Sequence, residues 1–193
     1  MAGSIITAGD ASTGTIINGP PGSDGTLILQ SGPSGAKVSA IVMDVNGYVT
    51  NTKQSAARRT RATAQAIANN TTTIVTYDTA VFDQQTESDA TGRFTAKASG
   101  IYHITASILY SNVAWPAGAV AYLSIFKNNI SFCLGTYWVS QLAQSSNASV
   151  QVSSGVNLAT GDFIDIRAAH TQGAAVNIQG DATFNYLSVH RVA

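Results

Sequence analysis

The side chains that most often catalyse reactions or bind metals are sparse in this chain. Its three histidines, His103, His170 and His190, lie far apart in the sequence, and no two have the spacing typical of metal ligands. A neutral, hydrogen-bonded histidine is the interpretation we favour for each of them. The single cysteine, Cys133, excludes an intrachain disulfide, and its apolar setting "ISFCLG" predicts a small buried side chain.

Two acidic residues, Asp162 and Asp165, lie beside Gly161, where a turn is expected. Two carboxylates fall short of the six or more oxygens that Ca²⁺ takes, so we interpret them as turn residues and keep a calcium site as the alternative. The segment "DVNG", 44–47, resembles the start of a calcium loop, but no acid follows at the right spacing, and we expect a hairpin turn. The sequence therefore predicts no metal site and no cofactor.

Catalytic motifs are also missing from the sequence. It has no Gly-x-Ser-x-Gly elbow, no phosphate-binding glycine loop before a helix, and no basic residue beside Cys133 to lower the pKa of its thiol. We predict no catalytic residues and no enzymatic activity. An enzyme on a jelly-roll scaffold, with an acid/base pair in one cleft, is the alternative.

The composition predicts a surface with few charged side chains. Of the 193 residues only 10% are charged, against about 25% in an average soluble protein, and the formal net charge is zero. No global field attracts nucleic acid or anionic membranes, and we expect neither as a partner. A basic cluster, "KQSAARRTR", holds Lys53, Arg58, Arg59 and Arg61, and is either a solvated linker or a docking segment for an acidic partner.

The termini and the hydropathy pattern add two expectations. The start "MAGSIITAGDASTG" has neither a basic nor an apolar region of the kind found in a secretory signal. No apolar run approaches the length of about 18 residues that indicates a membrane span. We expect no export signal and no membrane insertion.

Three zones divide the chain. Residues 1–52 are rich in Gly, Ser and Thr and contain short β-like pieces, with Asn46-Gly47 as the strongest hairpin signal. Because an isolated hairpin is marginal in water, this zone is expected to fold against a partner. Residues 53–66 are interpreted as a linker. Residues 67–193 show a β pattern throughout.

The β pattern of the third zone indicates an all-β sandwich. "GIYHITASILY" alternates apolar and polar residues, and "AVAYLSIFKNNISFCLG" is a hairpin whose strands we expect to be covered on both faces. Two further strand pairs are predicted around the turns at 160–162 and 179–181. No amphipathic helix of three turns is evident, and turn signals recur at the spacing of a sandwich.

Several ordered segments resemble a known family. "NNTTTIVTYDTAVFDQQ", "GRFTAKASGIYHITASI", "LSIFKNN", "LATGDFIDIRAAH" and "FNYLSVHRVA" together resemble the globular head of the C1q/TNF-like superfamily, in the branch common in bacterial and phage proteins. The chain departs from that pattern at Ile101, Asn129 and Phe163, which replace Tyr, Gly and Tyr. The positions that match are Asn69, Asn70, Thr71, Phe82, Asp83, Arg93, Phe94, Thr95, Gly100, Tyr102, Lys127, Asn128, Gly161 and Asp162.

This resemblance implies a ten-stranded jelly roll that assembles as a homotrimer. The residues agree, because several strands carry more apolar side chains than one buried face needs. A monomer with these side chains under its own loops is the alternative. The residues expected at the trimer interface are Tyr102, Tyr122, Phe126, Phe184 and Tyr186.

The first zone, through "DGTLILQSG", "GAKVSAIVMD" and "NGYVTN", is similar to the N-terminal segments of phage fibres and other virion appendages. The resemblances together imply a phage virion protein, a trimeric spike, fibre or capsid-decoration protein that binds other virion proteins through its N-terminus. The alternative is a receptor- or glycan-binding module of a tail fibre. Its candidate surface aromatics are Trp115, Tyr137 and Trp138, with a core or interface role as the competing explanation.

Overall fold

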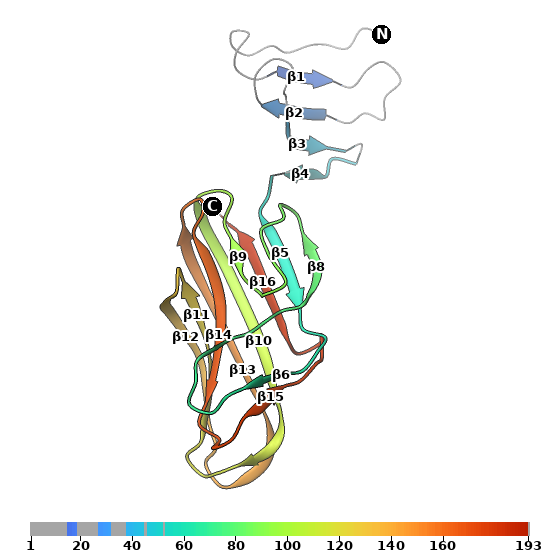
Figure 1. The fold of residues 1–193 in the computed structure, drawn as a ribbon. Helices are drawn as coiled ribbons and strands as arrows, with labels where there is room; N and C mark the ends of the chain where they lie inside the picture. The colour runs from blue at the N-terminus through green and yellow to red at the C-terminus, as the bar shows by residue number, and fades with distance from the viewer. Residues whose placement is uncertain (1–14, 19–26, 32–37, 45, 52, 193) are drawn as a thin grey trace. The chain divides into compact units, whose positions relative to one another are not determined.

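The computed structural model describes residues 15–18, 27–31, 38–44, 46–51 and 53–192. All the secondary-structure elements named among these residues are β-strands (Figure 1). The chain divides into two compact units, 1–54 and 55–193. This division replaces the predicted boundaries at 52 and 66, since residues beyond Gln54 already belong to the second unit.

The first unit contains a four-stranded antiparallel sheet in which each strand pairs with the next along the chain. Its strands are β1 (Thr15–Asn18), β2 (Leu27–Ser31), β3 (Val38–Met43) and β4 (Val49–Asn51). Tyr48 and Val49 are mostly exposed, which agrees with a sheet that buries little by itself.

The predicted hairpin at Asn46-Gly47 is confirmed between β3 and β4. One carboxylate oxygen of Asp44 accepts hydrogen bonds from the backbone N–H groups of Asn46 and Tyr48. Of these turn residues only Gly47 has a positive φ, +81°. The turn is therefore closed by an aspartate side chain, and the paired positive φ values expected of Asn-Gly are not needed.

The second unit is a sandwich of two antiparallel sheets. The first sheet has the order β6-β15-β10-β16-β5-β8, and β13 pairs with the other edge of β10 (Figure 1). The long strand β10 lies inside this sheet, and β13 forms one of its edges, because among the described strands it pairs with β10 alone. The strands of this seven-stranded sheet are β5 (Ala56–Thr60), β6 (Gln65–Ile67), β8 (Thr79–Asp83), β10 (Gly100–Trp115), β13 (Gln144–Leu158), β15 (Val176–Ile178) and β16 (Tyr186–Arg191).

The second sheet of the sandwich has the order β12-β11-β14-β7, with β9 also paired to β14. Its strands are β7 (Thr73–Ile74), β9 (Phe94–Thr95), β11 (Val120–Lys127), β12 (Ile130–Val139) and β14 (Phe163–His170). The described part of this unit has twelve strands where the resemblance implied ten, because short pieces such as β7 and β9 pair separately with β14.

Alternating residues of the long strands fill the space between the sheets. The even-numbered side chains of β10 from Tyr102 to Tyr110 are buried, as the alternation predicted. Trp115 closes one end of the core, where its ring meets Tyr110 edge-on at 5.9 Å and Trp138 at 4.9 Å. Its indole N–H donates to the Ser146 carbonyl at 3.0 Å.

Asn128, Asn129 and Gly161 form turns between strands, and Gly135 allows two strands to lie close together. The β11–β12 turn uses Asn128 and Asn129, both with positive φ, and the turn into β14 uses Gly161 at +89°, so both predicted turns are confirmed. At Gly135 an added Cβ would lie 2.1 Å from the Gln151 carbonyl oxygen. This glycine lets β12 approach β13 and close one side of the sandwich.

Three predictions differ from the structure. The stretch 53–66 is not a linker, because β5 pairs with β16 and β8 inside the seven-stranded sheet. The strands around the turn at 160–162 do not pair with each other, because β13 pairs with β10 of one sheet and β14 with β11 of the other. The pair expected around 179–181 is also wrong, because β15 pairs with β6 and β10 whereas β16 pairs with β10 and β5. Around both turns, local signals identified the strands but not their partners.

Candidate interaction surfaces

An exposed apolar strip runs along β12, the edge strand of the five-stranded sheet. We define the β12 strip as Ile130, Phe132, Leu134, Tyr137 and Val139. Ile130 is 73% exposed, Leu134 54% and Tyr137 53%. The expectation that both strands of this hairpin are covered is met in part for β11, whose inward side chains are buried and whose Tyr122 and Phe126 are half-buried, and it fails for β12.

The β12 strip lacks the features that usually protect an edge strand. No residue of β12 is charged and none is proline, although both are the common means of preventing association at a sheet edge. The opposite edge of β12 is paired to β11. A continuous apolar edge of this kind is typical of a protein–protein contact.

The predicted trimer-interface residues divide into two groups. Tyr102 is fully buried inside the sandwich, its hydroxyl donating to the Ala98 carbonyl at 2.7 Å, so its assignment to an interface is wrong. The other four retain exposed surface. Tyr122 and Phe126 on β11 are half-buried, Phe184 is 48% exposed, and Tyr186 lies under the Arg58 guanidinium.

Of those four, Tyr122 is adjacent to the β12 strip, because its ring stacks on that of Tyr137 at 5.7 Å. The prediction missed the other strip residues. Their signal was present in the sequence, since "ISFCLGTYWV" is apolar at both odd and even positions. Without the pairing order, however, nothing identified this strand as an edge.

The candidate ligand-binding aromatics are also reassigned. Trp115 is 1% exposed and belongs to the core, so it cannot offer a stacking face to a sugar. Trp138 is half-buried and packs against Trp115. Only Tyr137 is an exposed aromatic of the three, and it belongs to the β12 strip.

A hollow of about 560 Å³ lies beside Trp115 at one end of the sandwich. Amides and hydroxyls line it together with Pro116: the exposed Gln144 and Ser145, and Gln172, whose amide donates to the Ala114 carbonyl at 2.9 Å. Such groups suit hydroxyl-rich ligands, since each can donate and accept hydrogen bonds.

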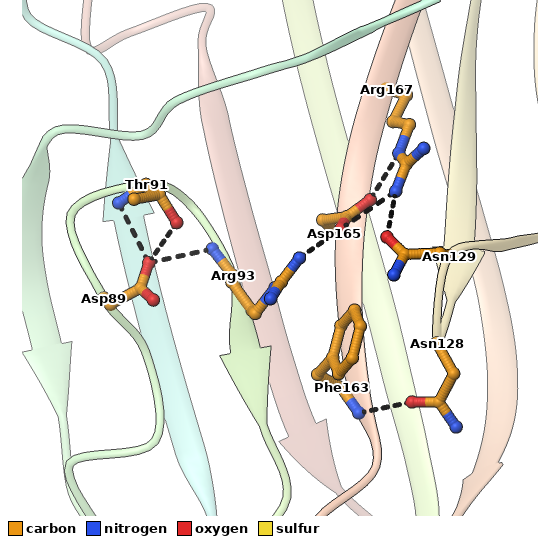
Figure 2. A network of polar contacts seen from close by, with 8 residues as sticks. All are labelled: Asp89, Thr91, Arg93, Asn128, Asn129, Phe163, Asp165 and Arg167. Carbon is orange, nitrogen blue, oxygen red and sulfur yellow. Dashed lines mark hydrogen bonds and ion pairs between the residues drawn. The ribbon is translucent and has the colours of Figure 1, made fainter.

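A polar network stands on the outer side of the five-stranded sheet (Figure 2). The Asp165 carboxylate is fully buried and contacts two guanidinium groups, Arg167 Nε at 2.7 Å and Arg93 Nη2 at 3.2 Å. Each arginine also covers an aromatic ring, Arg93 that of Phe163 at 3.8 Å and Arg167 that of Phe126 at 4.1 Å. The result is a stack in the order aromatic, cation, anion, cation, aromatic.

The two aspartates weighed as calcium ligands are engaged with other groups. The Asp165 carboxylate accepts hydrogen bonds from Arg93 Nη2 and from Arg167 Nε and Nη2. Asp162 accepts hydrogen bonds from Lys127 Nζ, Asn128 Nδ2 and the Ala159 N–H, which lower the pKa of its carboxyl far below the usual range. Both carboxylates thus serve the fold, and Asp162 holds the turn as expected.

The basic cluster is partly structural. Arg59 and Arg61 are buried, and both donate to backbone carbonyls: Arg59 Nε to Tyr77 at 2.7 Å and Arg61 Nη2 to Ala64 at 2.9 Å. Neither explanation offered for the cluster, a solvated linker or a docking segment, fits these two residues.

Among the described residues, no group of three or more His, Cys, Asp or Glu side chains is arranged to hold a metal ion. No helix in the same residues has the length and apolar character needed to cross a membrane.

Sequence comparison gives no relative: no protein-family model matches the chain, and a search of curated proteins returns no match. The fold does have solved counterparts. Two antiparallel sheets packed face to face, with β13 leading from one into β14 of the other, define a jelly-roll sandwich.

The counterparts are C1q and TNF domains. The Eiger TNF of S. frugiperda matches with a TM-score of 0.51 and 11% identity over 72% of this chain and 93% of that one. The globular domain of zebrafish complement 1qA gives 0.52 and 15% over 73% and 98%. Murine APRIL at pH 5.0 gives 0.53 and 13% over 72% and 100%. At these identities the likeness shows the fold: residues of the second unit form a C1q/TNF-like jelly roll.

Proposed function

We propose that this chain is a homotrimeric, non-enzymatic structural protein of a phage particle. In this proposal the first unit attaches to other virion proteins, as a spike, fibre or capsid-decoration protein, and the jelly roll forms the displayed knob. The observation that carries the proposal is the β12 strip, an uncharged apolar edge that needs a partner surface in water.

The β12 strip supports self-association, and the resemblance to C1q/TNF domains favours three protomers per assembly. In a closed trimer each contact joins two different surfaces, so the strip of one protomer packs on another part of the next. Phe184 and Tyr186 on the other sheet, and Tyr122 and Phe126 beside the strip, remain proposed contacts. Three knobs on one axis raise the effective concentration at a target surface, which suits attachment.

The separation into two units supports the division of roles. The zebrafish counterpart is described as a globular domain, and in this chain the jelly roll is a compact unit that follows a separate N-terminal one. Several apolar side chains of the first unit are exposed, Ile41, Met43, Tyr48 and Val49 among them. Such a surface fits a segment that is completed by contact with a partner.

Binding to particles tests the proposal. The full chain and a chain starting at Ser55, which keeps its own core, would be added to phage particles that lack the protein and sedimented with them. We expect the full chain to remain bound and the shortened chain to stay in the supernatant. Sedimentation of neither form, or of both equally, would contradict attachment through the first unit.

The hollow beside Trp115 supports a second candidate, a glycan-binding module. Its amides and hydroxyls are exposed, and Gln144 and Ser145 are not needed for the core. Replacing both by Ala and screening the folded protein on a glycan array tests this candidate. Binding that disappears in the variant supports it, and absence of binding by the parent chain contradicts it.

A further inference from the structure

Two histidines that lie far apart in the sequence face each other across neighbouring strands. His103 on β10 is paired in register with His190 on β16. Both side chains are exposed, and both point away from the core, because their neighbours Tyr102, Ile104 and Val189 are buried. Directly paired residues of an antiparallel ladder have Cβ atoms about 4.5–5.5 Å apart, within the reach of two imidazoles that share one ion.

The row that contains this pair leaves room around it. On either side of the two histidines the register places Gly155 on β13 and Ala56 on β5. A Cβ added at Gly155 would meet nothing within 4 Å. The ring of Phe82 stands 6.2 Å from that of His190 and forms an apolar wall. The β13 side therefore leaves space for an ion above the pair, whereas on the other side Ala56 is buried and the Phe82 ring stands against His190.

Each imidazole has a hydroxyl partner on one nitrogen. Nε2 of His103 lies 3.1 Å from the Ser153 hydroxyl, and Nε2 of His190 lies 3.0 Å from that of Ser188. A hydroxyl can accept from Nε2–H, which leaves Nδ1 as the lone-pair nitrogen. Metal-bound histidines commonly have such a partner on their second nitrogen, since it fixes the tautomer and orients the ring.

The charge around the pair also permits a cation. The cation closest in register on this face is Arg58, which lies in the next row opposite Ser188. Its guanidinium stands over the Tyr186 ring, 4.5 Å from the centroid, one row further from the histidines. Arg191 follows His190 but alternates to the other face of the strand, opposite Tyr102.

We propose that His103 and His190 form a binding site for a divalent transition-metal ion that prefers imidazole ligands, such as Zn²⁺, Ni²⁺ or Cu²⁺. The two protein ligands come from one protomer, so the site does not depend on the trimer. Water or a neighbouring molecule completes the coordination. The sequence indicated no metal ligands because the β10–β16 pairing, not spacing along the chain, brings the two together.

Copper(II) alone is the sharpest probe, because it binds most tightly of the divalent first-row ions and its electron paramagnetic resonance spectrum reports nitrogen ligands. The full chain would be titrated with CuCl₂ beside His103→Gln, His190→Gln and the double variant. Gln151→Ala, an exposed change on β13, is the matched control. All five proteins should unfold at the same temperature without metal, since the substituted side chains lie on the surface.

We expect the parent and the control to bind one ion per chain with two nitrogen ligands. Each single variant should lose one nitrogen and at least about tenfold in affinity, and the double variant should lose the site. Single variants that bind copper like the parent, or a parent that shows no nitrogen ligand, would overturn the proposal.

Discussion

The network around Asp165 yields a quantitative prediction about stability. Its carboxylate is fully buried, whereas the side chains of Arg93 and Arg167 are 35% and 17% exposed. Asp165→Asn keeps the shape of the side chain but removes the charge that holds both guanidinium groups. Two cations then remain next to each other, each above an aromatic ring and without an anion between them.

The expected loss follows from these contacts. Breaking a buried ion pair by changing one partner costs about 3–5 kcal/mol. Because both arginines reach solvent and can be rehydrated, we expect the lower end, about 3 kcal/mol. For a domain of this size that loss lowers the melting temperature by roughly 6–12 °C.

Urea unfolding at equal protein concentration measures this loss, since self-association makes stability depend on concentration. Asp162→Asn is the control: its carboxylate also pairs with a cation, Lys127, but in a more exposed position. The control should lose less stability, and added salt should reduce its loss. An Asp165→Asn variant within about 0.5 kcal/mol of the parent would refute the reasoning, because that is the range of ordinary surface changes.

The Tyr77 hydroxyl is buried with no hydrogen-bond partner among the described residues, and burial raises the pKa of the phenol. Tyr77→Phe removes this unpaired hydroxyl and should therefore raise the free energy of unfolding, measured in urea, by about 1 kcal/mol. A less stable variant would contradict this. Burial alone would raise the pKa of Asp78, but hydrogen bonds from Thr63, Ala62 and Thr79 and the charge of Arg61 lower it from 3.8 to about 2. Because the Asp78 carboxyl holds its proton less tightly in the folded than in the unfolded protein, the free energy of unfolding should fall as the pH drops from about 4 to about 2, and Asp78→Asn should flatten that dependence. An Asp78→Asn variant whose unfolding free energy depends on pH as the parent's does would contradict this prediction. Leu134→Glu places a charge in the β12 strip and should shift the protein to monomers in size-exclusion chromatography with light scattering, whereas Val81→Glu, on an exposed position of β8, should not.

Much of the jelly roll could be predicted from local pattern. The alternation in "GIYHITASILY" identified β10, and Asn and Gly residues identified the turns at 128–129 and 161. These features are local, because strand periodicity and positive φ depend on a few neighbouring residues. The fold itself came from the resemblance of ordered segments.

What failed depended on distant partners. "AARRT" was interpreted as part of a linker because two arginines in five residues look solvated, yet Arg59 is satisfied by carbonyls eighteen and nineteen residues away. Trp115 was a candidate platform because "NVAWPAGA" has the composition of a loop. The indole instead fills the end of the core, where Tyr110, Trp138 and His170 surround it.

The candidate surfaces required the sheet order. The apolar character of β12 is visible in the sequence, but only its position at a sheet edge turns that character into an exposed strip. The His103–His190 pair likewise depends on the register between β10 and β16. Pairing between strands so distant in the chain is set by the whole core, not by any short segment.

The central claim is that the β12 strip drives assembly into a trimer. Sedimentation equilibrium of the full chain at micromolar concentration tests it most directly. We expect a species of about 60 kDa, three times the 19.9 kDa of one chain. A single species of one chain's mass, unchanged as the concentration rises, would contradict it.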